Sequence, residues 1–129
     1  MPHLTIEYSA NLDANLDMGA FCAAMRDAMM ETGIFPLAGI RVRAFPCHTY
    51  VIADGDPTLA YLHMICRIGA GRDEATRLKA AEHIYAAAET HMKARVPGPF
   101  ALSLDLDELS AVTSLKRHNT IYDHLKAKT

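Results

Sequence analysis

Hydrophobic and polar residues alternate along the first segment of the chain, residues 3–9. Leu4, Ile6 and Tyr8 lie on one face of an extended segment, and the residues between them are polar. This period of two predicts a half-buried strand. From residue 18 the hydrophobic positions recur every three or four residues, which predicts an amphipathic helix ended by a glycine. The positions concerned are Met18, Phe21, Cys22, Met25 and Met29, followed by Gly33.

The same order of elements is predicted again further along the chain. A second strand is expected near Gly39 to Tyr50, where Ile40, Val42 and Ala44 alternate with Arg41, Arg43 and Phe45. A long strand then follows the loop ADGDPT, with one hydrophobic face formed by Ala60, Leu62, Met64, Cys66 and Ile68. A helix is predicted after GAGRDE, with an apolar stripe at Leu78, Ala81, Tyr85, Ala88 and Met92. The last strand, FALSLDLDEL, places Phe100, Leu102, Leu104 and Leu106 on one side, and a short helix is expected at Asn119 to Lys126.

These elements predict an α+β fold made of two βαβ units in one domain, residues 1–129. The units cover about residues 2–52 and 58–108, and residues 109–129 form a tail. Parallel strands joined by a helical crossover would give a four-stranded sheet with both helices on one face. The other face would carry Phe45, Tyr61 and His63 among polar groups. A half-covered sheet in an apolar chain predicts that a partner subunit covers this face, so we expect an oligomer.

Composition narrows the classes of function. The chain has 129 residues, 50% of them hydrophobic, and a net charge of −2. The absence of a basic excess argues against a nucleic-acid partner, and no apolar run is long enough for a membrane span. The three cysteines, Cys22, Cys47 and Cys66, are far apart and include no CxxC, which argues against a disulfide framework or a zinc site. We therefore expect a cytoplasmic protein.

Three arginines are candidates for binding an anion. Arg41 and Arg43 are two residues apart on a predicted strand, so they share a face. Arg72 stands in GAGR at the start of the second long helix, where glycines let the backbone approach a ligand and free N–H groups favour an anion. A solvated face would explain the first two as well. Arg72 is more informative, because a cation at a helix start is mildly unfavourable.

Other reactive side chains form no recognisable site. The seven histidines include no HExxH pair, and His63 on the uncovered face is the least ordinary of them. Asp105, Asp107 and Glu108 allow an interpretation as paired carboxylates, but we interpret them as the polar side and end of the last strand. No GxSxG, Walker A or dinucleotide-binding motif is present, so we expect no cofactor and no metal.

The N-terminus offers a different kind of group. Proline follows the initiator methionine directly, and a strand begins at once. Removal of Met1 would leave Pro2 with a free secondary amine that the strand holds in place. One amine and a few arginines form a coherent set for moving a proton on a carboxylated enol or ketone.

Several motifs resemble the 5-carboxymethyl-2-hydroxymuconate isomerase family of the tautomerase superfamily. They are the N-terminal PH, GIFPLAGIR at Gly33 to Arg41, ADG at Ala53 to Gly55, HM followed by IGAGR at His63 to Arg72, and ALS before an acidic strand. The resemblance runs in order over nearly the whole chain. It implies a homotrimer of tautomerase-like subunits without cofactor, acting on a small carboxylated dienol of homoprotocatechuate (4-hydroxyphenylacetate) catabolism. By motif, Pro2 would be the catalytic base, Arg41 and Arg72 would hold and polarise the substrate, and Arg43 would support binding at most.

Alternatives from the same superfamily and from outside enzymology remain. The chain could act on another 2-hydroxydienoate or a phenylpyruvate-like enol, or work as a hydratase or dehalogenase. A trimeric binding or scaffold protein would keep the fold without catalysis, and a cytokine-like role is a weaker idea because no secretory feature is present. Pocket shape decides substrate choice among these, and the sequence does not show it.

Overall fold

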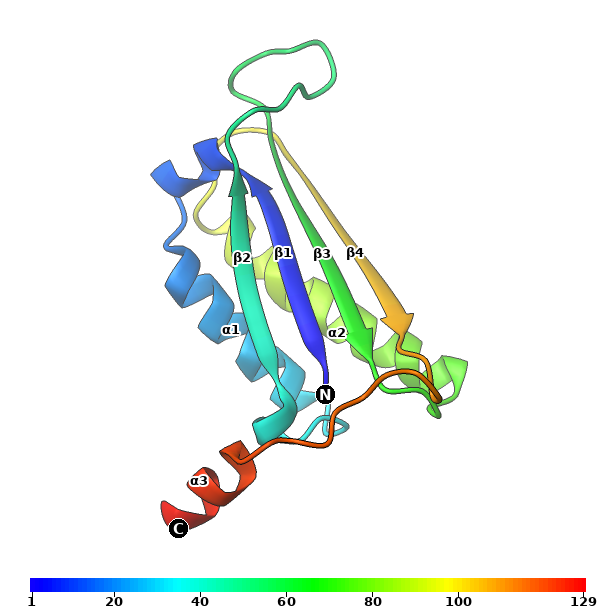
Figure 1. The fold of residues 1–129 in the computed structure, drawn as a ribbon. Helices are drawn as coiled ribbons and strands as arrows, with labels where there is room; N and C mark the ends of the chain where they lie inside the picture. Colours follow the sequence, from blue (N-terminus) through cyan, green and yellow to red (C-terminus); the bar gives the residue numbers. More distant parts are fainter.

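The computed structural model describes residues 1–129 and has a four-stranded sheet with two long helices (Figure 1). The strands are β1 (His3–Ser9), β2 (Arg41–Cys47), β3 (Ala60–Ile68) and β4 (Phe100–Glu108). The long helices are α1 (Met18–Glu31) and α2 (Glu74–Lys93), and the tail ends in α3 (Ile121–Ala127). Two 3₁₀ turns, η1 (Ala10–Ala14) and η2 (Leu37–Gly39), precede α1 and β2. No helix has the length and apolar character needed to cross a bilayer.

The sheet has the strand order β2-β1-β3-β4. β1 pairs with β2 in parallel, β3 pairs with β4 in parallel, and the two central strands β1 and β3 are antiparallel. Each parallel pair is joined by a long helix, as the predicted βαβ units require. The predicted α+β fold is therefore confirmed. The second strand is shorter than predicted, because Gly39 lies in the turn η2 and the ladder ends at Cys47.

Both long helices cover the same face of the sheet (Figure 1). On that face, Leu4 and Ile6 of β1 and Met64 of β3 are fully buried, and they pack with Phe21 and Met25 of α1. Such burial contributes roughly 1.5–3 kcal/mol for each large side chain. The alternation predicted for β1 and β3 is confirmed by their burial.

The apolar stripe predicted for α2 was partly wrong. The buried residues are Ala80, Ile84, Ala88 and Met92, whereas the predicted Leu78 is 56% exposed. Steps of four residues advance about 400°, so this line winds slowly around the helix and follows the twisted sheet. Alanine carries little pattern information because it is small, so the hydrophobic pattern favours the larger Leu78 over Ala80.

The opposite face of the sheet is open in this chain, as predicted. Phe45 is 53% exposed there, and it lines a shallow hollow of about 250 Å³ with Thr5, Glu7, His63 and Ile65. The His63 ring contacts two β4 side chains, with Nδ1 2.6 Å from Ser103 Oγ and Nε2 3.7 Å from Asp105 Oδ2. Both long helices pack on the other face, so the aromatic and apolar groups on this face form a large exposed surface.

Candidate active site

The topology brings the predicted site residues to one end of the sheet. β1 and β2 begin at this end, because they are parallel, and the antiparallel β3 ends there together with β4. The N-terminus, the loop before β2 and the loop between β3 and α2 therefore meet (Figure 1). Pro2, Arg41 and Arg72 come from these three segments.

Pro2 is buried and held on two sides. Its carbonyl oxygen accepts a hydrogen bond of 3.1 Å from the backbone N–H of Arg41, which extends the β1–β2 ladder to the second residue. Its ring lies close to Gly39, where an added Cβ would be 3.2 Å from Pro2 Cδ. Since Cδ is bonded to the proline nitrogen, a side chain at Gly39 would press on the ring next to that nitrogen.

The Arg41 guanidinium is anchored to the backbone of its own loop. Nη1 donates to the carbonyl oxygen of Ala38 at 2.9 Å and to that of Ile40 at 3.4 Å. The side chain is half-buried, and it forms no ion pair with a carboxylate. Its charge is therefore available to a ligand.

Arg72 bridges the two loops of the site. Nη2 donates to the carbonyl oxygen of Ile34 at 2.7 Å, and Nη1 donates to that of Gly69 at 3.3 Å. The guanidinium also stacks over the Phe35 ring, 5.3 Å from its centroid, a cation–π contact. Like Arg41, Arg72 is half-buried and has no carboxylate partner.

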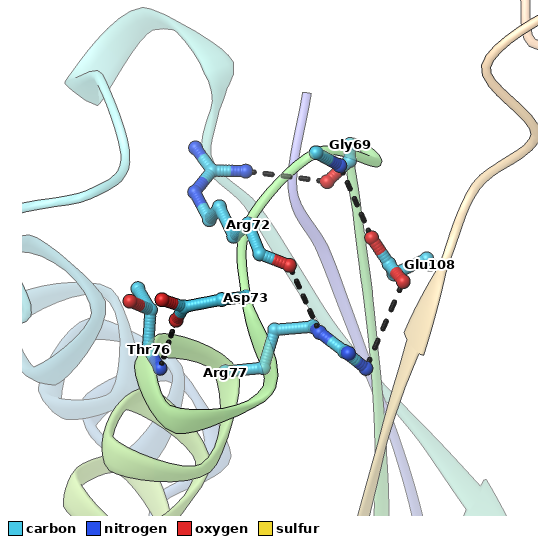
Figure 2. A network of polar contacts seen from close by, with 7 residues as sticks. Gly69, Arg72, Asp73, Thr76, Arg77 and Glu108 are labelled. Carbon is cyan, nitrogen blue, oxygen red and sulfur yellow. Dashed lines mark hydrogen bonds and ion pairs between the residues drawn. The ribbon is translucent and has the colours of Figure 1, made fainter.

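A polar network shapes the loop that carries Arg72 (Figure 2). Glu108 accepts a hydrogen bond from the N–H of Gly71 at 3.2 Å and lies 3.7 Å from Nη1 of Arg77. Arg77 in turn donates from Nε to the carbonyl oxygen of Arg72 at 3.3 Å, and Asp73 caps α2 through the N–H of Thr76 at 2.8 Å. Glu108 is thus more than the polar end of a strand, because it holds the backbone next to Arg72.

The electrostatics of this end favour an amine in its neutral form. The Met1 α-amino group has a lowered pKa because burial disfavours its charge, and because Lys116, Arg41 and Arg72 repel it. While Met1 is attached, the Pro2 nitrogen is an amide without basicity. Pro2 is the next residue in the chain, so a prolyl amine freed by removal of Met1 would lie near the same positive charges.

Sequence reasoning missed two residues of the tail that reach this site. Lys116 Nζ lies 3.6 Å from the position of a Cβ added at Gly69. Asn119 Nδ2 donates to the Ala38 carbonyl oxygen at 3.1 Å and lies 3.9 Å from Met1 Sδ. The tail has no hydrophobic period that would predict where it packs, so no local signal indicates these contacts.

Arg43 is not part of this group of residues. Its side chain is exposed on the open face, where Nη1 lies 3.1 Å from Nδ1 of His3. Burial lowers the pKa of His3, and the Arg43 charge lowers it further, which favours a neutral ring that accepts this hydrogen bond. No group of three His, Cys, Asp or Glu side chains is arranged to hold a metal ion.

Comparison with known proteins agrees with this geometry. Residues 2–125 match the 5-carboxymethyl-2-hydroxymuconate isomerase family. The chain is 37% identical over 120 residues to 5-carboxymethyl-2-hydroxymuconate Delta-isomerase of Escherichia coli. The aligned region covers 92% of this chain and 95% of the relative. A crystal structure of a 5-carboxymethyl-2-hydroxymuconate delta-isomerase superposes with a TM-score of 0.84 at 34% identity, over 96% of this chain and 93% of the other.

A more distant structure shares the fold alone. It is the fused 4-OT wild-type symmetric trimer, with a TM-score of 0.70 at 13% identity, over 91% of this chain and 94% of the other. The fold of two βαβ units in one four-stranded sheet, together with these relatives, defines a protein of the tautomerase superfamily. Within that superfamily, the chain belongs to the 5-carboxymethyl-2-hydroxymuconate isomerase family.

Proposed function

We propose that this protein isomerises 5-carboxymethyl-2-hydroxymuconate to its 2-oxo-3-ene isomer, with the amine of Pro2 as the general base. The observation that carries this proposal is a buried proline at position 2, directly after Met1, at the same end of the sheet as two guanidinium groups that have no carboxylate partner. Membership of the isomerase family supports the substrate. The reaction would serve homoprotocatechuate catabolism in the cytoplasm, and it needs no cofactor because one proton moves and no electrons are transferred.

The first step is removal of Met1, which a small second residue such as proline favours. The free Pro2 nitrogen then takes the proton of the 2-hydroxyl group. The O–H electron pair forms the C2=O bond, the C2=C3 pair moves to C3=C4, and the C4=C5 pair accepts the proton from nitrogen at C5. Proton and electrons balance, and the amine returns to its neutral form.

The arginines have two roles in this scheme. Arg41 and Arg72 are already fixed by backbone carbonyl oxygens, so they bind substrate carboxylates without further ordering. Their charges also stabilise the dienolate as it forms. The same charges keep the prolyl amine deprotonated near neutral pH, because a cation raises the free energy of a second cation nearby.

The active protein would be a homotrimer. The open sheet face, with Phe45 53% exposed, supports a second and third subunit as its cover. The distant structural relative with the same fold is a symmetric trimer. Residues 1–129 would act as one domain in each subunit, and Arg43 on the open face would take at most a supporting part in binding.

The test follows the ultraviolet absorbance of 5-carboxymethyl-2-hydroxymuconate, using protein whose N-terminus mass spectrometry shows to begin at Pro2. We expect a large acceleration over the uncatalysed ketonisation, and a loss of about 10²–10⁴-fold in Pro2→Ala, the usual range for a positioned base. Arg41→Ala should raise KM and lower kcat. Protein that retains Met1 is a second control, because its Pro2 nitrogen is an amide without basicity. Absence of acceleration by the wild type would refute the proposed function.

A further inference from the structure

The tail crosses the site end of the sheet after β4. It leaves β4 with the Leu109 N–H bonded to the Ile68 carbonyl oxygen at 2.7 Å, and it then passes by the N-terminus toward α3 (Figure 1). Asn119 fastens it there, because Nδ2 donates to the Ala38 carbonyl oxygen while Oδ1 accepts from the N–H of Ile121 at 3.0 Å. The tail is therefore fastened at Leu109, next to β3, and at Asn119, next to the loop before Arg41.

Lys116 is the cation that this segment brings to the site. Its Nζ lies near Gly69, in the same loop whose carbonyl oxygen holds Arg72. The side chain is exposed, and it has no ion-pair partner anywhere in the chain. Burial is the largest cause of the lowered pKa of the Met1 α-amino group. Lys116 comes next, ahead of Arg41 and Arg72.

The proposed substrate has three carboxylates. If Arg41 and Arg72 bind one carboxylate each, the third has no arginine partner. Two carboxylates end the muconate chain, and the third is on the carboxymethyl branch at C5. The prolyl amine must deliver its proton to C5, so the branch is attached to the atom that approaches the amine. A flexible ammonium group beside the amine is suited to a carboxylate on a flexible arm, because it acts as a point charge with three rotatable donors.

We propose that Lys116 binds the carboxymethyl carboxylate of the substrate and thereby selects the tricarboxylate over plain 2-hydroxymuconate. This proposal rests on the proposed function for the identity of the substrate. Asn119 is a positioning residue in it, since it holds the tail that carries Lys116. Lys116 is exposed, so its replacement leaves the core of the fold untouched.

The test compares wild type, Lys116→Met and Lys116→Arg on two substrates, 5-carboxymethyl-2-hydroxymuconate and 2-hydroxymuconate. Hydrogen bonds to charged groups are stronger than those between neutral groups, and the exposure of Lys116 to water reduces its contribution. We expect Lys116→Met to raise KM for the three-carboxylate substrate about tenfold. KM for 2-hydroxymuconate should change less than about twofold, and Lys116→Arg should restore most of the loss. Lys128→Met is the matched control, because Lys128 is an exposed lysine that directly follows α3.

A binding measurement keeps this proposal separate from catalysis. Calorimetry with propane-1,2,3-tricarboxylate and with glutarate should show weaker binding of the tricarboxylate alone in Lys116→Met. If the wild type has no isomerase activity yet shows this difference, the proposed function fails and the role of Lys116 as a carboxylate ligand stands. Equal effects on both substrates and both ligands, or no effect on either, would overturn the inference.

Discussion

Gly39→Ala changes the wall behind the proline nitrogen by a single methyl group. The backbone of Gly39 has no positive φ, so alanine fits the main-chain conformation. The new Cβ would lie 3.2 Å from Pro2 Cδ and 3.5 Å from Pro36 Cγ. Ordinary contacts between carbon atoms begin near ~3.5 Å, so the Pro2 ring has to move by a few tenths of an ångström.

That movement is transmitted directly to the reacting atom. Cδ of Pro2 is bonded to the nitrogen, and the Pro2 carbonyl oxygen is fixed by the Arg41 N–H at 3.1 Å, so the ring pivots about its anchored end. A misplacement of about 1 Å costs on the order of 10²-fold in rate, so a few tenths should lower kcat about three- to tenfold. Overpacking should lower the free energy of unfolding by about 1–3 kcal/mol. Part of this loss is offset, because alanine in place of glycine reduces the entropy of the unfolded chain and so stabilises the fold by ~0.4–1 kcal/mol.

The assay is the absorbance assay of the proposed reaction, run with a thermal melt of the same protein. Gly98→Ala is the control, because its added Cβ meets only the Thr58 carbonyl oxygen at an ordinary 3.6 Å. We expect Gly39→Ala to lose kcat while its melting temperature falls by only a few degrees. Unchanged kcat in Gly39→Ala would show that the place of the nitrogen does not depend on Gly39, and the geometric reasoning would be refuted.

Three further predictions follow from the fold and the site. Ile84→Ala should destabilise the protein by about 2–5 kcal/mol in urea unfolding, whereas Leu78→Ala should stay within about 1 kcal/mol, because only Ile84 is buried. Glu108→Ala should lower kcat/KM about three- to tenfold by freeing the N–H of Gly71, and Glu108→Gln should retain most activity because it still accepts that hydrogen bond. Burial and the charges of Lys116, Arg41 and Arg72 lower the pKa of the Met1 α-amino group, and a free Pro2 amine would lie near the same charges. We therefore expect kcat/KM of the processed protein to rise with pH through a midpoint below the pKa of free proline amide, and a midpoint at or above that value would contradict the assignment.

The elements of the fold were accessible from the sequence because burial repeats at the period of each structure. β3 buries every second residue from Ala60 to Ile68, so its hydrophobic pattern indicates a strand and a face at once. In α2 the core positions include Ala80 and Ala88, which are small and occur equally on exposed faces. The pattern therefore identified the helix and misjudged its rotation, because packing on a twisted sheet fixes that rotation and local composition does not.

Some residues of the candidate site are indicated by their local sequence, and others are brought there only by the packing of distant segments. Arg72 could be predicted from GAGR, since glycines and a helix start favour an anion there. Glu108 of β4 contacts Gly71 from 37 positions along the chain, and Lys116 reaches the site through a tail fastened at Leu109 and Asn119. Contacts of this kind depend on how the elements pack, so no spacing in the sequence indicates them.

The arginines at this end of the sheet differ in whether a carboxylate of the protein lies beside them. Those without such a partner are the ones available to a substrate. Arg77 is 3.7 Å from the Glu108 carboxylate, so its charge is largely satisfied within the protein. Arg41 and Arg72 lie at the same end of the sheet and donate only to backbone carbonyl oxygens. Leaving half-buried cations together without carboxylates opposes folding, because like charges repel and each loses hydration. The proposed substrate, with three carboxylates, would relieve this repulsion on binding, so we expect the free protein to be less stable than its complex with the substrate.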